Sequence, residues 1–360
     1  MNQALTLKDI AREAGVSLMT VSRALRHDPK VSAPLRTEII GIAERLGYRP
    51  NPLVSALMSY RRAGKPAHCD LVVAFITNFP TRDGWRDFRL YQEFYRGADQ
   101  SANRHGYHLE EFWMAEPGMT PARLSAILRT RNIIGVLLAP LATPVGRLEL
   151  EWDQFQAVTF GYSIIEPPLH RVSNFQFRSM RLVMMKLAEC GYRRPGLALS
   201  QSLDDRVLHQ WLGGFLVEKK SLRERPIPLY LAPDQKWSQQ RFENWLNKHR
   251  PDVVIAHSEE LIQWVRHSGR RVPEDVGFVH LDCPAVGGEL SGLYQNGPEI
   301  GAAAADMLIG MLRRNERGLP VLPRALLIEG SWAQGKTIRP LAGGSFAGDA
   351  GASACDSCYD

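Results

Sequence analysis

The chain has 360 residues, of which 44% are hydrophobic and 23% are charged. This composition is typical of a soluble globular protein with two or three structural units, and no apolar run reaches the roughly 20 residues that cross a bilayer, which argues against a membrane protein. The first 66 residues hold 11 Lys/Arg against 5 Asp/Glu, whereas the remainder holds 33 of each. A basic unit joined to an electrically balanced body indicates a module that binds a polyanion, and charge alone is compatible with DNA, RNA or an anionic membrane.

The N-terminal stretch MNQALTLKDIAREAG lacks the apolar core of a secretory signal, so we expect a cytoplasmic protein. The five cysteines form an odd, scattered set that suits a reducing compartment. Cys355 and Cys358 form a CxxC motif in a segment rich in Gly, Ala and Ser, with no second pair and no histidine nearby. This is a weak metal or redox signal, and we expect neither a metal nor a cofactor.

Apolar residues recur at helical spacing from Leu7 to Leu46 and are interrupted twice by turn residues, which predicts three short helices. The first helix is expected from Leu7 to Ala14. It begins with Thr6 and Asp9 as a capping-box pair and ends at Gly15, which adopts the left-handed conformation without steric cost.

The second helix is expected from Leu18 to about Leu25, with Ser17 as its N-cap and Val21 on its packed face. Its other face is free to contact a partner. The third helix is capped by Ser32 and ends at Gly47. Beyond it, residues 53–58 are compatible with one more short helix, which could not persist alone in water.

From residue 66 onward, short β-type apolar runs alternate with amphipathic helical stretches, which predicts parallel α/β sheets. The expected strands are Leu71–Ile76, Ile133–Ala139, Ala157–Phe160, Gly196–Leu199, Val253–Ala256 and Val276–Leu281. The expected helices are Glu93–His105, Pro121–Thr130, Met180–Cys190, Leu208–Lys219, Gln239–His249, Ser258–His267 and Glu299–Arg314. That many units exceeds one sheet and suggests two lobes, whereas the segment from about Pro340 cannot bury enough surface to order itself.

The stretch TLKDIAREAGVSLMTVSRAL, from Thr6 to Leu25, resembles the headpiece signature of the LacI/GalR transcriptional regulators. Val31-Ser32, the motif LGYRPNP at 46–52 and the motif VPEDVGFVHLD at 272–282 extend the resemblance. It implies an α/β protein with a three-helix helix-turn-helix headpiece at 1–49 and a hinge helix and linker at 50–60. A two-lobed domain of the type I periplasmic-binding-protein kind, for effector binding and dimerisation, is then expected at 61–338, and a disordered tail at 339–360.

For DNA contacts, the resemblance implies base reading by Leu18, Met19 and Arg23 in the major groove. Since Leu18 and Met19 form no strong hydrogen bonds, their readout would be apolar, unless they pack inward instead. The positions implied near the DNA backbone are Lys8, Ser17, Thr20, Arg26, Ser32, Tyr48 and Asn51. Leu57, beside Ala56, matches a hinge leucine that wedges into the minor groove, and the alternative is an ordinary core or interface leucine.

For the effector cleft, the resemblance implies polar groups and an aromatic platform between the lobes, with Asp282 at an acidic ligand-contact position. Two departures are visible, because the usual Asn-Asp reads His257-Ser258 and the usual Asp-Asn near the lobe crossover reads Phe175-Gln176. Trp211 stands where an effector-anchoring arginine is frequent, and Arg206 is a candidate substitute. Asn78 and Phe79 follow the first strand of the body, at the strand ends where open α/β sheets bind ligands.

These features predict a DNA-binding regulator that binds a pseudo-palindromic double-stranded operator as a homodimer and responds to a small metabolite such as a sugar. We expect a repressor, because repression is more usual than activation for this architecture. An effector-independent dimeric regulator is the alternative, and a solute-binding receptor is a remote one. No enzyme motif of the HExxH, Walker, GxSxG or GxGxxG kind is present, so we expect no catalytic activity.

Overall fold

The computed structural model describes residues 6–25, 28, 30–46, 48, 71–220, 227–284 and 286–340. The chain divides into two units, one containing the N-terminal helices and the other containing residues 72–309 and 318 onward. The predicted hinge at 50–60, with Asn51, Ala56 and Leu57, lies outside the described residues, as do Arg26 and the CxxC motif. No helix in the described ranges has the length and apolar character needed to cross a membrane.

Three helices form the N-terminal headpiece, namely α1 (Leu7–Glu13), α2 (Leu18–Ala24) and α3 (Ala33–Leu46). The Asp9 carboxylate accepts hydrogen bonds from the Thr6 backbone N–H at 2.9 Å and from the Thr6 hydroxyl at 2.8 Å, which starts α1. Gly15 has φ +63° and turns the chain after α1. The Ser17 hydroxyl then caps α2 by accepting from the Thr20 N–H at 3.1 Å. The predicted caps of the first two helices are therefore confirmed.

The headpiece has its own hydrophobic core. Its buried members come from all three helices and the loop before α3: Ile10, Val21, Ala24, Val31, Ile39, Ile42 and Ala43. A core of this size buries one face of α2 and leaves the opposite face exposed.

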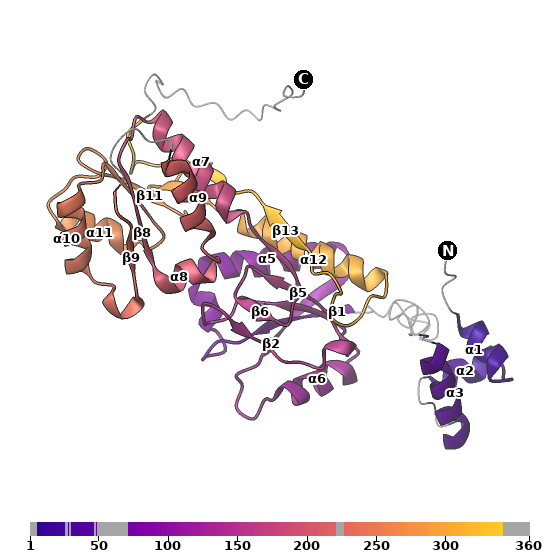
Figure 1. The fold of residues 1–360 in the computed structure, drawn as a ribbon. Helices are drawn as coiled ribbons and strands as arrows, with labels where there is room; N and C mark the ends of the chain where they lie inside the picture. Colours follow the sequence, from indigo (N-terminus) through magenta and orange to yellow (C-terminus); the bar gives the residue numbers. More distant parts are fainter. Residues whose placement is uncertain are drawn as a thin grey trace, which may run out of the picture. The chain divides into compact units, whose positions relative to one another are not determined.

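The second unit contains two six-stranded sheets, each forming one lobe (Figure 1). The first lobe has the strand order β13-β7-β5-β3-β1-β2, with β1 (Leu71–Thr77), β2 (Tyr107–Trp113), β3 (Gly135–Leu138), β5 (Gln156–Phe160), β7 (His170–Asn174) and β13 (Ala325–Ile328). The second lobe has the order β14-β12-β11-β10-β8-β9, with β8 (Pro195–Ser200), β9 (Tyr230–Ala232), β10 (Val253–Ala256), β11 (Gly277–His280), β12 (Ser291–Tyr294) and β14 (Ser331–Ala333). A small parallel pair joins β4 (Gly146–Arg147) to β6 (Ile164–Glu166).

Helices connect these strands in both lobes. They are α5 (Arg89–Arg104), α6 (Pro121–Thr130), α7 (Gln176–Glu189), α8 (Gln201–Arg206), α9 (Gln210–Lys219), α10 (Gln239–His249), α11 (Glu260–His267) and α12 (Gly297–Arg313), with short 3-10 turns at Gly84–Asp87, Trp152–Gln154 and Asp234–Lys236. The pairs β1/β3, β3/β5, β5/β7 and β7/β13 are parallel, as are β9/β8, β8/β10, β10/β11 and β11/β12, whereas β12/β14 is antiparallel. The predicted two-lobed α/β architecture is thus observed.

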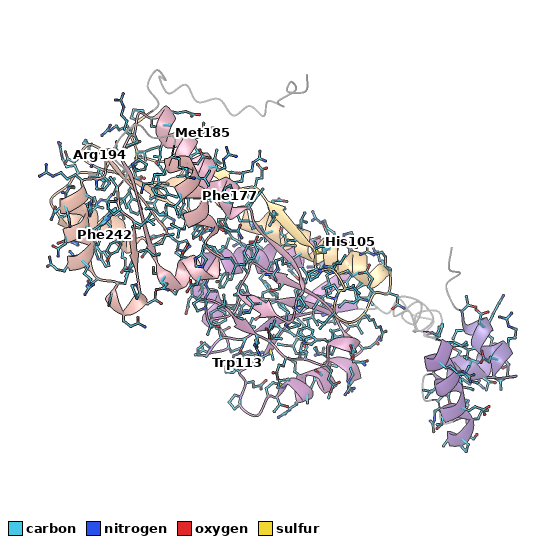
Figure 2. All side chains as sticks on the ribbon, viewed as in Figure 1. His105, Trp113, Phe177, Met185, Arg194 and Phe242 are labelled. Carbon is cyan, nitrogen blue, oxygen red and sulfur yellow. The ribbon has the colours of Figure 1, made fainter. Side chains whose placement is uncertain are left out.

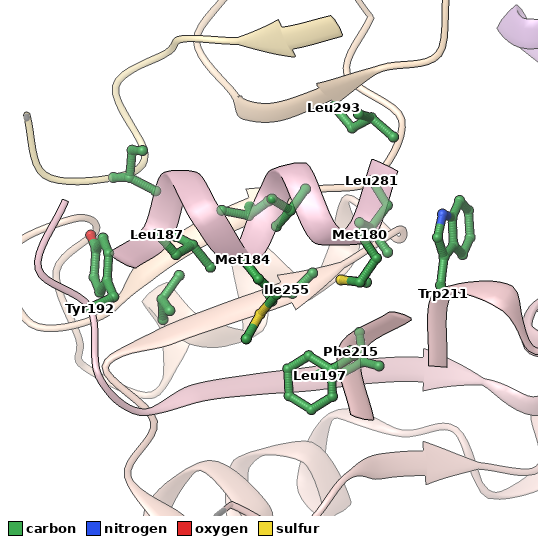
Figure 3. Packing of buried hydrophobic residues seen from close by; sticks show 14 of the residues in the cluster. Met180, Met184, Leu187, Tyr192, Leu197, Trp211, Phe215, Ile255, Leu281 and Leu293 are labelled. Atoms are coloured by element: carbon green, nitrogen blue, oxygen red, sulfur yellow. The ribbon is translucent and has the colours of Figure 1, made fainter. Parts of the chain in front are cut away.

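Each lobe has a separate hydrophobic core. In the second lobe, Met180, Met184 and Leu187 of α7 face Leu197 of β8 and Ile255 of β10 (Figure 3). On the other side of the same sheet, Phe242 of α10 is fully buried (Figure 2). Burial on both faces explains why these strands are continuous apolar runs rather than alternating ones.

The helices α5 and α12 approach each other very closely in the first lobe. A Cβ atom on Gly97 would lie 1.9 Å from the Pro298 carbonyl oxygen, and one on Gly301 would lie 2.1 Å from the Phe94 carbonyl oxygen. Only glycine permits this packing, so both positions are fixed by the backbone of the facing helix.

The chain passes between the lobes three times, after β7, after β12 and after β13. The side chain of Asn174, at the first crossing, donates hydrogen bonds to the backbone oxygens of Gln295 at 3.3 Å and Ile328 at 3.2 Å, at the other two. Gln176 also donates to the Gln295 side chain at 3.1 Å. These buried bonds tie the three crossings together and fix the axis about which the lobes are joined.

The helix predicted from Leu208 to Lys219 is α9, which begins two residues later, at Gln210, whereas the preceding helix α8 was not predicted. Leu208 and His209 have φ values of +51° and +59°, so a left-handed turn separates α8 from α9. The helix α5 also begins at Arg89 rather than at the predicted Glu93, which adds one turn that faces the cavity between the lobes.

Candidate nucleic-acid interface and interlobe cavity

The exposed face of α2 carries the three residues predicted to read bases. Leu18 is 42% exposed and Met19 is 58% exposed, whereas Val21 and Ala24 on the opposite face are fully buried. The alternative in which Leu18 and Met19 pack inward is therefore wrong. Large apolar side chains on a headpiece surface are poorly placed in water and well placed for contact with thymine methyl groups.

Arg23 lies near the end of α2 with 41% of its side chain exposed. Its Nε atom is 3.9 Å from the Asp28 carboxylate, a loose ion pair that high dielectric and salt weaken. The guanidinium therefore exchanges this partner for another acceptor at small cost. Of the positions predicted near the DNA backbone, Lys8, Ser17 and Ser32 are exposed, and Thr20 and Tyr48 are half-buried.

A cavity of about 310 Å³ lies between the two lobes of the second unit. Its wall includes Tyr91, Phe94, Tyr162 and Ser163 from the first lobe and Trp211, His257, His280 and Asp282 from the second. A neighbouring cavity of about 390 Å³ lies at the carboxyl ends of β8 and β10, and Phe88, Leu203, Arg206 and His257 line both. The location agrees with the rule that open α/β sheets bind ligands at the carboxyl ends of their strands.

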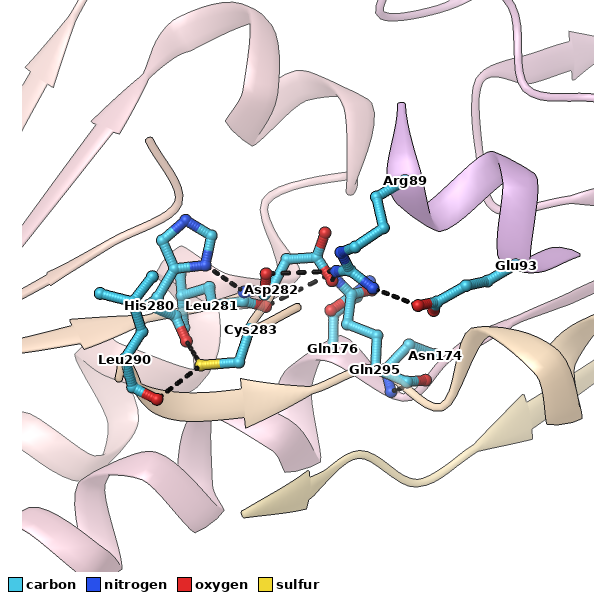
Figure 4. A network of polar contacts seen from close by, with 10 residues as sticks. All are labelled: Arg89, Glu93, Asn174, Gln176, His280, Leu281, Asp282, Cys283, Leu290 and Gln295. Carbon is cyan, nitrogen blue, oxygen red and sulfur yellow. Dashed lines mark hydrogen bonds and ion pairs between the residues drawn. The ribbon is translucent and has the colours of Figure 1, made fainter. Parts of the chain in front are cut away.

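An ion-pair network crosses this cavity (Figure 4). Arg89, at the start of α5, pairs with Glu93 at 2.5 Å in its own lobe and with the Asp282 carboxylate of the second lobe at 2.6 Å. Burial raises the pKa of both Asp282 and Glu93, even though the positive charge of Arg89 lies beside each of them. One guanidinium thus compensates two poorly solvated carboxyl groups.

Arg206 forms a second bridge between the lobes. From the end of α8 it donates hydrogen bonds to the Tyr91 hydroxyl at 3.2 Å, to the Leu141 carbonyl at 2.9 Å and to the Ala142 carbonyl at 3.0 Å. All three acceptors belong to the first lobe, so Arg206 holds the lobes together through neutral oxygens.

Three rings of the second lobe form a series along the cavity wall. The ring centroids of Trp211 and His257 are 5.5 Å apart, and those of His257 and His280 are 5.6 Å apart. Burial, together with the positive charges of Arg89 and Arg206, lowers the pKa of His257 to about 4. Burial and the neighbouring His257 lower the pKa of His280 to about 4 as well. Both imidazoles are therefore neutral near pH 7.

The structure distributes the predicted effector residues unevenly. Arg206, Trp211, His257 and Asp282 all line the cavity between the lobes. Asn78 and Phe79 are not among its lining residues, and Phe79 instead packs behind Phe88, with ring centroids 5.7 Å apart. The Phe79 carbonyl accepts a hydrogen bond from Trp113 at 2.7 Å, and Trp113 is marked in Figure 2.

Several cavity residues were not singled out from the sequence, notably Arg89, Tyr91 and His280. Arg89 and Tyr91 lie on the turn of α5 that precedes its predicted start. His280 lies inside a predicted strand. The sequence feature that could have identified it is the motif HLD at 280–282, in which it stands two residues before Asp282. Among the described residues, no group of three His, Cys, Asp or Glu side chains is placed to hold a metal ion.

Comparison with known proteins gives two family matches. Residues 6–51 match the model described as "Bacterial regulatory proteins, lacI family", and residues 185–331 match the "Periplasmic binding protein-like domain". Among curated proteins, the chain is 24% identical over 328 residues to the HTH-type transcriptional regulator PtxS of Pseudomonas putida, covering 86% of this chain and 90% of that protein. It is 22% identical to the ribose operon repressor of Bacillus subtilis, covering 93% and 98%.

Solved structures share the fold. The transcriptional regulator CelR in complex with cellobiose aligns with a TM-score of 0.53 and 20% identity, over 92% of this chain and 99% of that one. The lac repressor dimer bound to operator aligns with a TM-score of 0.53 and 18% identity, over 94% and 100%.

A helix-turn-helix headpiece joined to a two-lobed periplasmic-binding-protein-like domain defines a DNA-binding transcriptional regulator. The chain belongs to the LacI family of bacterial regulatory proteins.

Proposed function

We propose that this regulator is a repressor that binds a pseudo-palindromic operator as a homodimer and that a small ligand in the cavity between its lobes controls operator affinity. The single observation that carries the proposal is the cavity itself, which both lobes line and which Arg89–Asp282 and Arg206 span. A ligand there contacts both lobes and shifts their closure by its differential affinity for the open and closed states.

In this proposal, α2 enters the major groove of each half-site. Leu18 and Met19 contact thymine methyl groups, and Arg23 leaves Asp28 for a guanine edge. Lys8, Ser17, Thr20, Ser32 and Tyr48, with Arg26 and Asn51, contact the DNA backbone, and Leu57, beside Ala56, wedges into the minor groove. Because a homodimer has a two-fold axis, its two headpieces bind two half-sites that are related by the same symmetry. The solved lac repressor structure, described as a dimer bound to operator, is the support for this arrangement.

Selection of bound sequences from random duplex DNA tests the proposal. We expect a palindromic consensus sequence. We also expect the affinity of the protein for this sequence to change when a pool of metabolites that includes its ligand is added. The absence of any enriched sequence would contradict operator recognition.

A second candidate is an effector-independent dimeric regulator. The observation that favours it is Arg206, whose three hydrogen bonds join the lobes directly through protein groups. A palindromic consensus that no metabolite affects, together with no binding of any pooled compound to the purified protein, is the outcome that this candidate predicts.

A further inference from the structure

Two series of rings face the cavity, one from each lobe. In the first lobe, Phe88 and Tyr91 have ring centroids 5.0 Å apart with an interplanar angle of 28°, and Tyr91 and Phe94 are 6.0 Å apart at 25°. The second-lobe series is Trp211, His257 and His280, with interplanar angles of 37° and 30°. All six rings line the same cavity. A cavity lined by rings from both lobes is suited to an aromatic ligand.

The strongest polar groups of the cavity are already bonded within the protein. Arg89 is held by Glu93 and Asp282, and Arg206 by Tyr91 and two backbone oxygens. The Asn174 side chain is held at the lobe crossing. A hexose presents several hydroxyl groups, each of which needs partners when it is buried. Arg89 and Arg206 could satisfy such hydroxyl groups only by giving up the bonds that join the lobes.

Apart from Asp282 Oδ1, which is ion-paired with Arg89, three cavity side chains each have a buried atom without a hydrogen-bond partner among the described residues. These are Trp211 Nε1, His280 Nε2 and Gln176 Oε1, on side chains that are 1%, 3% and 5% exposed. The His280 Nδ1 atom accepts the Asp282 backbone N–H at 3.1 Å, so in the neutral ring Nε2 carries the proton. Gln176 donates through Nε2 to the Gln295 side chain, which leaves its oxygen free to accept. These three side chains therefore offer two donors and one acceptor, beside the hydroxyl groups of Tyr162, Ser163 and Ser173 that also line the cavity.

Charge limits the ligand further. The cavity wall contains both signs of charge, and Arg89 already compensates two carboxylates. A cationic ligand would lie near Arg89 and Arg206, and an anionic one near Asp282 and Glu259. An anion could pair with Arg206 only if Arg206 gave up its bonds to the first lobe, and a cation could pair with Asp282 only by displacing Arg89.

We infer that the ligand of this cavity is a small, uncharged aromatic compound with few polar groups, such as a hydroxylated benzene ring, sandwiched between the two ring series. Its oxygens accept from Trp211 and from His280, and a hydroxyl donates to Gln176. This inference rests on the proposed function for its regulatory consequence, but the binding itself is measured separately.

The test is calorimetric titration of the full chain with 4-hydroxybenzyl alcohol. The matched comparison is 4-(hydroxymethyl)cyclohexanol, which has the same hydroxyl groups without a flat ring, and glucose, hypoxanthine and 4-hydroxybenzoate complete the set. We expect the aromatic alcohol to bind at least about tenfold more tightly than each of the others, a difference of about 1.4 kcal/mol.

Two variants locate the bound compound. Trp211→Phe keeps the ring and removes the N–H, and we expect it to weaken binding roughly fivefold to tenfold. Trp332→Phe is the matched control, because Trp332 packs against the same hydrophobic cluster and does not line the cavity. Equal effects of the two variants would overturn the assigned site.

The outcomes separate the two proposals. Tighter binding of glucose, hypoxanthine or the benzoate, or no binding of the aromatic alcohol, overturns the inferred ligand class. If glucose, hypoxanthine or the benzoate then changes operator affinity, the proposed function stands although the inferred ligand class is wrong. If the aromatic alcohol binds through Trp211 but neither it nor any pooled metabolite changes operator affinity, the inference stands and the proposed regulation fails.

Discussion

Arg206 and Tyr91 belong to different lobes, and the Arg206 guanidinium donates a hydrogen bond to the Tyr91 hydroxyl at 3.2 Å. The same guanidinium reaches two backbone oxygens of the first lobe, so a single side chain supplies three bonds across the cavity. Because Arg206 crosses the cavity in which we propose that a ligand binds, we expect it to couple cavity occupancy to lobe closure.

Replacing Arg206 with Leu should therefore open the lobes. Each lost bond involves a charged donor and contributes about 1.5–3 kcal/mol. The closed arrangement of the lobes therefore loses several kcal/mol of stabilisation. Small-angle scattering of the ligand-free protein should give a larger radius of gyration than the wild type. Arg266→Leu, at an exposed position on α11, is the control and should leave the scattering unchanged. An identical curve for Arg206→Leu would mean that other contacts hold the lobes closed.

Replacing Arg23 with Ala should abolish sequence preference while nonspecific, salt-sensitive binding remains. The reason is that the base-edge contact is lost and the backbone contacts stay. Competition gel shifts with a selected operator and a scrambled duplex measure the ratio. Arg178→Ala, on α7 of the second unit, removes an arginine whose side chain is 62% exposed, against 41% for Arg23, and should leave that ratio unchanged. Retained operator selection by Arg23→Ala would remove Arg23 from the reading surface.

The free energy of unfolding should fall as the solution is acidified through the histidine range. His257 and His280 have folded pKa values of about 4, below the 6.5 of the unfolded chain, so the unfolded state binds more protons between these values. Their contribution is complete above pH 6.5 and is lost toward pH 4, at about 1.4 kcal/mol per pH unit for each histidine.

The raised pKa values of Asp282 and Glu93 act in the opposite direction at the acid end, because the folded state then binds more protons. The comparison of His257→Gln with the wild type isolates the histidine. Denaturant titrations from pH 7 to pH 5 should show a shallower loss of stability in this variant, whereas His267→Gln, at an exposed position, should retain the wild-type slope. Equal slopes for His257→Gln and the wild type would contradict the buried neutral imidazole.

Two glycine substitutions should have opposite signs. Gly97→Ala places a methyl group against the Pro298 carbonyl and should cost several kcal/mol by forcing α5 and α12 apart. Gly41 lies within α3, and a Cβ atom there would have no neighbour within 4 Å. Gly41→Ala should therefore stabilise the headpiece by about 0.5–1 kcal/mol. Thermal unfolding of both variants measures this. A neutral Gly97→Ala would refute the close contact between these helices.

Sequence periodicity predicted the long, strongly patterned elements well, and α6 and α10 have the expected bounds. It missed β2, β4, β6, β7, β9, β12, β13 and β14, which are short or, like Tyr107–Trp113 and His170–Asn174, contain charged and polar residues that break the apolar runs. It also missed the short helix α8 and placed the start of α9 two residues too early, since the positive φ angles of Leu208 and His209 are a tertiary requirement that no glycine in the sequence indicates.

The cavity was predictable only in part. Asp282, His257, Trp211 and Arg206 could be proposed from the resemblance, because each sits at a recognisable motif position. Arg89, the partner of Asp282, lies 193 positions away along the chain. No local pattern connects two such residues, and only the folded lobes bring them together.

The three crossings between the lobes also determine how this protein can be divided. The headpiece helices form one continuous stretch from Leu7 to Leu46, so exchanging them with those of a relative requires a single junction. Neither lobe is one continuous stretch of chain. The chain enters the second lobe after β7, returns after β12 to add β13 to the first sheet, and then adds β14 to the second sheet. Recombination at one point therefore combines a new headpiece with an intact two-lobed domain. A chimaera that exchanges one lobe instead needs matched junctions at all three crossings. These junctions must preserve the hydrogen bonds of Asn174 and Gln295.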